Sequence, residues 1–270
     1  MTECILESIH IYPLKSCGGI ALGEVDLDRF GPVGDRRWMV VEPSGQFLSQ
    51  RQVPAMALLG VRVESCGGLL LTREGSVCEV PVPGAGALAL EVTVWSDRVP
   101  ALDAGDAAAT WLTRALGRPC RLVYMADETR RPVDLDYALR GETVSFADGF
   151  PLLLISAASL AELNNRLAQN GHPAVPMNRF RPNLVVSGCG PFAEDGWRRI
   201  RIGGVELQVA KPCARCAIPA IDQSSGERDP YINRALAAFR RFDGQILFGQ
   251  NLLYQQGGTI GVGDPVEVLE

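Results

Sequence analysis

Short apolar segments, each closed by a cluster of glycine, proline or serine, run through the first hundred residues and restrict this half of the chain to β-structure. Strands are expected at residues 5–12, 37–41, 58–64, 69–72 and 90–95. Strands this short and this often interrupted predict a small barrel or a strongly bent sheet. Residues 106–116 are rich in alanine and carry apolar side chains on one face, which predicts a helix that ends at Gly117.

The second half repeats the strand signals and adds a helix near its start. Strands are expected at residues 152–155, 184–187, 200–202, 205–209 and 266–269. Ser159 and Glu162 have the spacing of a capping box, which predicts a helix with Leu160, Leu163 and Leu167 on its inner face.

A polar stretch at residues 126–149 separates the two halves and is expected to be an interdomain connection or a loop over a site. The predicted domains are therefore residues 1–125 and 126–270. A third helix is expected at 231–240, burying Leu236 and Phe239. The predicted fold class is α+β and β-dominated, with an N-terminal small β-barrel or bent sheet before a second β-rich domain with a few helices.

Charge and cysteine usage narrow the classes of function. The net charge is −5, so no basic field favours nucleic acid or an anionic membrane. The N-terminus is acidic where a signal peptide is basic, and no apolar run is long enough to span a membrane. We therefore expect a soluble, cytoplasmic protein. Its eight cysteines are expected to be free thiols, mostly buried, because a reducing cytosol opposes disulfides.

A Cys-x-x-Cys pair, Cys213 and Cys216, lies between the cations Lys211 and Arg215. Neighbouring cations favour the thiolate, the form that binds metal. Zinc would need a second cysteine pair or two histidines nearby, and a thioredoxin-like pair would open a helix. Neither context is present in the sequence. A purely structural pair of buried cysteines is the alternative that spacing alone leaves open.

Further motifs offer groups that bind anions or polar heterocycles. A Lys15-Ser16 turn leads into two glycines, and Arg36 follows in Gly-Asp-Arg-Arg-Trp. Arg181 and Asn183 enter one expected strand, and Asn251 stands at the entrance of another. Each motif taken alone is equally consistent with an ordinary turn or a solvated arginine.

In this order, six motifs resemble the MOSC family, which is named after the C-terminal domain of molybdenum cofactor sulfurase. They are Tyr-Pro-Leu-Lys-Ser-Cys, Asp-Arg-Arg-Trp, Arg-Phe-Arg-Pro-Asn, Cys-Ala-Arg-Cys, Phe-Gly-Gln-Asn and Val-Gly-Asp-Pro-Val. The resemblance runs from about Ile9 to Val268 and includes the N-terminal barrel found in amidoxime-reducing components and their bacterial relatives. It implies a MOSC-type β-barrel in the second half.

The resemblance also implies a molybdenum-pterin cofactor (molybdopterin) with Cys216 as its only protein ligand to the metal and Cys213 as a neighbour. The residues implied to hold the cofactor phosphate are Lys15, Ser16 and Arg36. Those implied around the pterin are Ser156, Arg181, Asn183, Arg215 and Asn251. The segment after Cys216 departs from the family pattern, although Asp222 and Gly226 match it, so the substrate is less constrained than the cofactor.

The implied activity is reduction of a small N-hydroxylated substrate, such as a hydroxylaminopurine, amidoxime or hydroxylamine, to the amine. Asp222 is the candidate proton carrier. Because the chain has no Cys-x4-Cys-x2-Cys ferredoxin motif, electrons are expected from a separate flavin or iron-sulfur reductase. Two alternatives remain: a carrier of molybdenum cofactor or of persulfide sulfur on Cys216 without turnover, and a binding module with inert cysteines.

Overall fold

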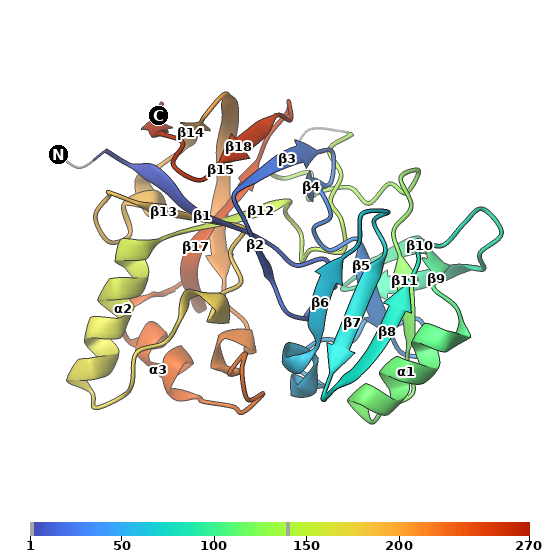
Figure 1. The fold of residues 1–270 in the computed structure, drawn as a ribbon. Coiled ribbons are helices and arrows are strands. Elements are labelled where there is room, and N and C mark those ends of the chain that lie inside the picture. The colour runs from blue at the N-terminus through green and yellow to red at the C-terminus, as the bar shows by residue number, and fades with distance from the viewer. Residues whose placement is uncertain (1–2, 139–140) are drawn as a thin grey trace.

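The computed structural model describes residues 3–138 and 141–270 as two lobes built mainly of strands (Figure 1). Within these residues there are three α-helices, and the strands form four sheets, the largest of them curled and nine-stranded. The predicted α+β, β-dominated fold class is confirmed. Two parts of the sequence predictions lie outside the described residues. They are the first two residues of the acidic N-terminus and residues 139–140 of the predicted connection.

The barrel lobe (residues 37–125) contains two antiparallel sheets and one helix. One sheet has the order β5-β11-β10-β9, and the other β6-β7-β8. These strands are β5 (Trp38–Val41), β6 (Gly60–Val63), β7 (Leu69–Arg73), β8 (Ser76–Val80), β9 (Ala89–Val94), β10 (Asp97–Asp103) and β11 (Arg121–Tyr124). All four residues of β5 are buried because apolar clusters cover both of its faces, which explains its continuous apolar sequence.

Helix α1 (Asp106–Leu116) closes the barrel lobe, as the sequence predicts. Its residues Ala108, Leu112 and Leu116 pack into the same core as Trp38. The helix ends at Gly117, which adopts the left-handed conformation at φ 66° that favours glycine.

The sheet lobe (residues 3–35 and 152–270) is built on the nine-stranded sheet, in the order β19-β14-β15-β17-β12-β13-β1-β2 with β16 beside β17. The strands are β1 (Ile5–Ile11), β2 (Ile20–Leu22), β12 (Leu152–Ser156), β13 (Leu184–Ser187), β14 (Arg199–Ile202), β15 (Val205–Ala214), β16 (Arg241–Phe242), β17 (Gln245–Leu253) and β19 (Val266–Val268). Helices α2 (Ala157–Gln169) and α3 (Tyr231–Phe239) pack on it through Leu163, Leu167, Ile232 and Leu236.

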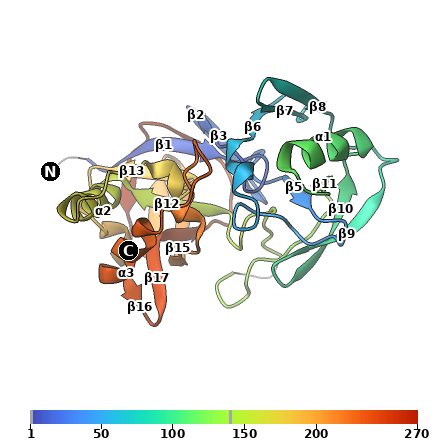
Figure 2. The same cartoon turned by 90° about the horizontal axis from the view of Figure 1, so that it is seen from below.

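The first strands of the chain belong in space with the C-terminal half. Strand β1 pairs antiparallel with β13. Strand β3 (Glu24–Asp28) pairs with β18 (Thr259–Gly261) on one side and with β4 (Gly31–Pro32) on the other. Figures 1 and 2 both show the blue N-terminal strands among orange and yellow C-terminal ones. The predicted domain division therefore does not describe which strands share a sheet, and the segment between β1 and β5 runs along the boundary between the lobes.

The predicted capping box of α2 is wrong. The helix begins earlier, at Ala157, and its N-cap is Ser156, whose hydroxyl accepts a hydrogen bond from the Ser159 amide. Ser159 is thus the third residue of the helix, and the Glu162 carboxylate instead accepts from the Arg166 side chain one turn later.

Other differences concern length and position. The sequence patterns did not predict β2, β3, β4, β8, β10, β11, β16 and β18, and Pro100 within β10 hides that strand's pattern. They placed Asn251 at the entrance of a strand, whereas β17 begins earlier, at Gln245, so Phe248 and Asn251 lie inside it. The third helix is confirmed, with Leu236 buried and Phe239 only partly buried. Among the described residues, no helix combines the length and apolar character needed to cross a membrane.

Candidate functional site

A cavity of about 120 Å³ at the boundary between the lobes collects most of the residues that the sequence predicts for a site. Its lining includes Lys15, Ser16, Arg36, Asp148, Arg181, Asn183, Cys213, Arg215, Cys216 and Asn251. These residues come from the segment after β1, the connection after β11, the approach to β13, the end of β15, and β17. The pairing of β1 with β13 brings residues separated by more than a hundred positions together here.

Three residues of this lining hold a backbone conformation that side chains with a Cβ rarely adopt. Ser16, Arg36 and Arg181 have φ values of 67°, 47° and 55°. Each left-handed residue costs about 1–2 kcal/mol, so the surrounding structure has to hold it. The Arg36 amide donates to the Tyr12 carbonyl at 2.9 Å, and Arg181 Nη1 donates to the Cys17 carbonyl at 2.7 Å. Such strain concentrates at functional sites.

Four cations surround the cavity and outnumber the carboxylates near them. Arg36 pairs with buried Asp35 at 2.6 Å. Lys15 pairs with Asp148 at 2.6 Å, and its Nζ also donates to the Phe146 carbonyl. Arg181 and Arg215 form no ion pair with any residue in the described part of the chain. The cavity therefore carries excess positive charge within an acidic protein, which favours an anionic ligand.

Burial changes the proton affinity of these groups. It lowers the pKa of Lys15 to about 8, with Asp148 opposing the shift. Burial alone would raise the pKa of Asp148, but Lys15 and the nearby arginines keep it below its usual value. Burial also lowers the pKa of Arg181. Lys15 is thus the cation of this site that loses its proton in weakly alkaline solution.

Two side chains of the cavity wall, Arg215 and Asn251, have unused hydrogen-bonding capacity. The Nε of Arg215 is buried without a partner, although the same guanidinium donates to the Phe180 carbonyl at 2.7 Å and to the Cys213 sulfur at 3.2 Å. An unpaired buried donor costs free energy that a bound acceptor would recover. Asn251 makes one long contact, 3.4 Å from its Nδ2 to the Lys211 carbonyl.

Both cysteines of the Cys-x-x-Cys pair are free thiols in the cavity wall. The Cys216 sulfur accepts from the Ile218 amide at 3.5 Å and lies 3.8 Å from Nη1 of Arg51. No group of three or more His, Cys, Asp or Glu side chains that could hold a metal ion occurs in residues 3–138 and 141–270. A metal at Cys216 would therefore take its remaining ligands from a cofactor.

Three predicted residues have defined structural contacts. The Asn183 oxygen accepts from Arg36 and from the Leu153 amide, and its nitrogen donates to the His10 carbonyl. Ser156, the N-cap of α2, is fully buried and does not line the cavity.

Asp222 also lies outside the cavity lining. Its carboxylate accepts from the side chain and amide of Ser224 and pairs with buried Arg179 at 2.6 Å. The hydrogen bonds from Ser224, with a smaller contribution from Arg179, lower the pKa of Asp222 to about 2. A carboxylate with this pKa is a weak base, so the geometry favours holding the turn over carrying a proton.

Three residues went unnoticed in the sequence: Arg51, which lies near the thiol, Asp148, which lines the cavity, and Trp95, which contacts both of them. The Trp95 indole nitrogen donates to Oδ1 of Asp148 at 3.3 Å. Asp148 belongs to the polar stretch at residues 126–149 that the sequence predicts as a connection or a loop over a site. The sequence therefore pointed to this segment but not to Asp148 itself. Arg51 and Trp95 follow no motif.

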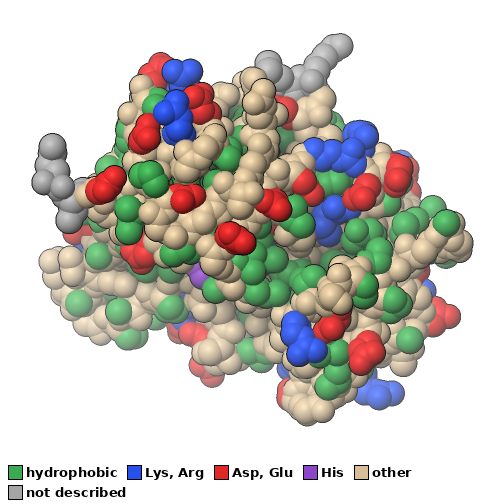
Figure 3. All heavy atoms as spheres, turned by 45° about the horizontal axis from the view of Figure 1, so that its top comes forward, with side chains coloured by type: hydrophobic (Ala, Val, Ile, Leu, Met, Phe, Trp, Pro, Cys, Tyr) green, Lys and Arg blue, Asp and Glu red, His purple; other side chains and the backbone are tan. Residues whose placement is uncertain are grey.

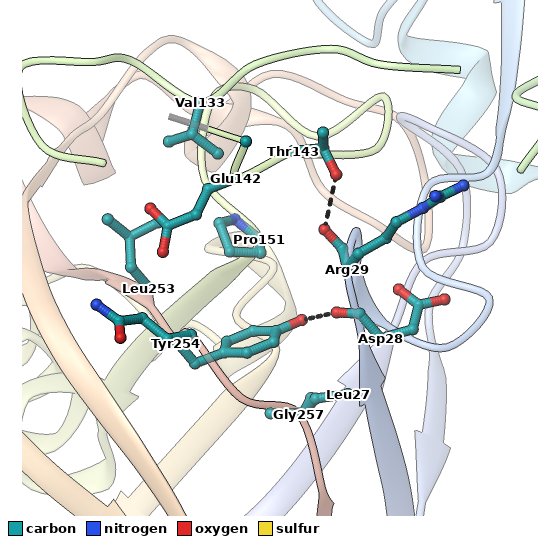
Figure 4. Close-up of a pocket in the computed structure, with 12 residues that line it drawn as sticks. Leu27, Asp28, Arg29, Val133, Glu142, Thr143, Pro151, Leu253, Tyr254 and Gly257 are labelled. Atoms are coloured by element: carbon teal, nitrogen blue, oxygen red, sulfur yellow. Dashed lines mark hydrogen bonds between the residues drawn. The ribbon is translucent and has the colours of Figure 1, made fainter. Parts of the chain in front are cut away.

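Larger cavities lie elsewhere, and the two with the greatest volumes adjoin each other. One of about 550 Å³ is lined by residues of β3, the 133–151 segment and the end of β17 (Figure 4). There the Tyr254 hydroxyl donates to the Asp28 carbonyl, and the Thr143 hydroxyl donates to the Arg29 carbonyl at 2.9 Å. The other, of about 620 Å³, adjoins it and shares Tyr254. Neither cavity is lined by a residue predicted for the site.

The surface charge is mixed. Figure 3 shows acidic and basic side chains interspersed over the visible face.

A volume of about 120 Å³ is below the roughly 300–1,000 Å³ of small-molecule sites. Asp148 stands over Lys15 with 62% of its side chain exposed, so it can withdraw without unpacking a core. The donor set otherwise fits an anionic, metal-carrying cofactor: two thiols, four cations and, on one of these cations, a buried donor without a partner.

Comparison with protein families gives two adjacent matches. Residues 4–119 match the MOSC N-terminal beta barrel domain, and residues 141–267 match the MOSC domain. Together the two models cover most of the chain.

Curated relatives resemble the chain over nearly its whole length. Mitochondrial amidoxime-reducing component 1 of Homo sapiens is 33% identical over 285 residues, covering 97% of this chain and 82% of the relative. The Mus musculus protein of the same name is 32% identical, with coverages of 97% and 81%. Molybdenum cofactor sulfurase of Arabidopsis thaliana is 33% identical and also matches 97% of this chain, but only 35% of its own length.

Proposed function

Since the chain belongs to the MOSC family and carries that family's N-terminal beta barrel domain, we propose that it binds a molybdenum cofactor and reduces N-hydroxylated compounds to amines. The substrates are hydroxylaminopurines, amidoximes or hydroxylamines. Electrons come from a separate flavin or iron-sulfur reductase in the cytoplasm. One observation carries the proposal: the Cys216 thiol shares a cavity with two buried cations, Lys15 and Arg181, and two partly buried ones, Arg36 and Arg215.

The cations divide by position into two roles in this proposal. Lys15, Ser16 and Arg36 follow β1 and precede β5, and they bind the doubly negative phosphate through an ammonium, a hydroxyl and a guanidinium. Binding requires Lys15 to exchange its Asp148 partner for phosphate. Arg36 keeps Asp35 as a second, buried partner, which holds the guanidinium in place.

The pterin lies along Arg181, Arg215 and Asn251. Arg215 supplies the Nε donor that has no partner, and Asn251 supplies an amide with one long contact. Cys216 provides the thiolate ligand, and Cys213 stays hydrogen-bonded to Arg215 as a neighbour. Asn183 supports the site by holding Arg36, and Ser156 and Asp222 act through the fold.

When bound, the molybdenum cofactor supplies the two-electron chemistry that removes oxygen from an N-hydroxyl group. The protein contributes binding, orientation and electrostatics. The arginines lower the cost of placing a polyanion in a buried site, and the Ile218 amide and Arg51 both contact the Cys216 sulfur.

A carrier of molybdenum cofactor or persulfide sulfur is the second candidate. The similarity to a molybdenum cofactor sulfurase favours it, because the match covers almost the whole of this chain. A carrier would hold cofactor or sulfur at Cys216 and show no turnover with any reductant.

Metal and pterin analysis of three proteins tests the proposal: wild type, Cys216→Ser and Cys213→Ser, each made in a cofactor-competent host. Wild type and Cys213→Ser should contain equal molybdenum and pterin, and Cys216→Ser should lose the metal. Wild type should then reduce an amidoxime with NADH and a supplied flavin or iron-sulfur reductase. A cyanide-releasable sulfur on Cys216, without molybdenum, would favour the carrier. Equal molybdenum in wild type and Cys216→Ser would refute both.

A further inference from the structure

Arg51 of the barrel lobe reaches the thiol of the sheet lobe. It lies in the 49–52 turn after β5, and its Nη1 is 3.8 Å from the Cys216 sulfur. Hydrogen bonds from both lobes fix this turn. The amides of Gln50 and Gln223 donate to each other at 2.9 Å, and Arg228 donates to the Arg51 carbonyl at 2.6 Å.

Aromatic rings and not a carboxylate hold the Arg51 side chain. Its guanidinium carbon lies 4.5 Å from the centre of the Trp95 ring and 5.6 Å from that of Phe47. Among residues 3–138 and 141–270 it forms no ion pair with any acid. The aromatic rings therefore support the faces of the Arg51 guanidinium, and no carboxylate among the described residues forms an ion pair with it. Its N–H groups can donate to an oxygen atom of a bound ligand.

Trp95 has an unusual position for a tryptophan. It begins the turn between β9 and β10, has a left-handed backbone with φ 57°, and leaves 46% of its surface exposed. Water-facing aromatic surface and backbone strain both cost free energy. Contacts with Phe47, Arg51 and Asp148 fix the ring beside the cavity.

We propose that Arg51 and Trp95 form a substrate-binding arm that selects flat aromatic N-hydroxylated compounds over aliphatic ones. Arg51 donates to the oxygen of the N-hydroxyl group and positions it near the Cys216 sulfur. Trp95 stacks on the flat ring that carries this group. The inference rests on the proposed function and names the substrate class for the same site.

Two ligands of equal size but different shape test Trp95: N-phenylhydroxylamine, which is flat, and N-cyclohexylhydroxylamine, which is not. Dissociation constants are measured by isothermal titration on the protein as purified, without reductant, so that binding is read apart from turnover. Trp95→Ala should weaken binding of the phenyl compound about tenfold and leave the cyclohexyl compound within twofold. Trp95→Phe should restore most of the preference.

Phe242→Ala is the matched control, because Phe242 is also an exposed aromatic residue with an arginine against its ring. It lies in β16 outside the cavity lining and should change neither constant. Equal weakening of both ligands by Trp95→Ala, or no binding of either ligand to wild type, would overturn the proposed arm.

Arg51→Lys tests the oxygen contact. Lysine keeps the charge but loses the planar guanidinium, so both ligands should bind about tenfold more weakly, with the preference for phenyl retained. Arg62→Lys, at an exposed ion pair in β6, is its control. Unchanged affinity in Arg51→Lys would refute the role of Arg51. These dissociation constants do not depend on catalysis. If the protein contained no molybdenum but still distinguished the two ligands, the proposed function would be refuted and the substrate-binding arm would be supported.

Discussion

The ammonium of Lys15 donates a 2.6 Å hydrogen bond to the carboxylate of Asp148, so the cation suited to bind phosphate already has an anionic partner. The two side chains differ in exposure, with 6% of Lys15 and 62% of Asp148 accessible. Lys15 is fixed in the cavity wall, and Asp148 is the partner that can move. We therefore expect this pair to determine how strongly the site takes up an anion.

Replacing Asp148 with asparagine should strengthen anion binding when Lys15 is protonated. Because the substitution also removes the carboxylate that raises the Lys15 pKa, binding is measured well below pH 6.5. The substitution removes a negative charge that competes for Lys15. Because Asp148 is largely exposed, we expect a gain of only about 1 kcal/mol, or about fivefold, in the dissociation constant of inorganic phosphate. Isothermal titration measures it. Asp136→Asn, in the exposed connection, is the control that should leave phosphate binding unchanged.

Anion binding should weaken as pH rises through the pKa of Lys15. Burial lowers that pKa to about 8, so the free site is positively charged at pH 7 and loses this charge between about pH 7 and 9. Phosphate affinity measured across this range should fall in wild type. In Lys15→Arg the fall should be smaller, since arginine remains charged and only the ionisation of phosphate itself, which both proteins share, changes with pH. The same slope in both proteins would contradict a role for Lys15.

Asp222→Asn should destabilise the protein without changing the pH profile of reduction. The native pKa of about 2 lies below the unfolded value, so the stabilisation is present above the unfolded pKa and is lost as pH falls through about 2. We expect a loss of about 1–2 kcal/mol at pH 7, because Asp229 still pairs with Arg179. Urea unfolding measures the loss. A shifted acidic limb in the rate profile would instead assign proton transfer to Asp222.

Ser156→Ala should cost stability and spare the cofactor. The hydroxyl caps α2 and hydrogen-bonds the Ser159 side chain, and loss of such a cap costs about 1 kcal/mol. Molybdenum and pterin content per folded protein should equal that of wild type. A loss of pterin at unchanged stability would instead show that Ser156 contributes to cofactor binding.

The sequence by itself determined the residue types of the site and most of the elements that carry them. Strand periodicity gave β1, β5, β13 and β14, and helix periodicity gave α1 and α3, because these patterns depend on neighbours within a few positions. The thiol of Cys216 and the cations Lys15, Arg36 and Arg181 also stand in local motifs. Their chemistry could be read without knowing where the chain folds back.

Only the tertiary structure decided which of these groups meet. The pairing of β1 with β13 brings Lys15 and Arg36 to Arg181 and Cys216, and no local pattern specifies a contact across more than a hundred residues. Ser156 and Asp222 stand at positions that the sequence suggests for the site. In the structure Ser156 caps α2 and Asp222 holds the 222–226 turn, so neither lines the cavity. Arg51 follows no motif, because it reaches the thiol only when the barrel lobe packs against the sheet lobe.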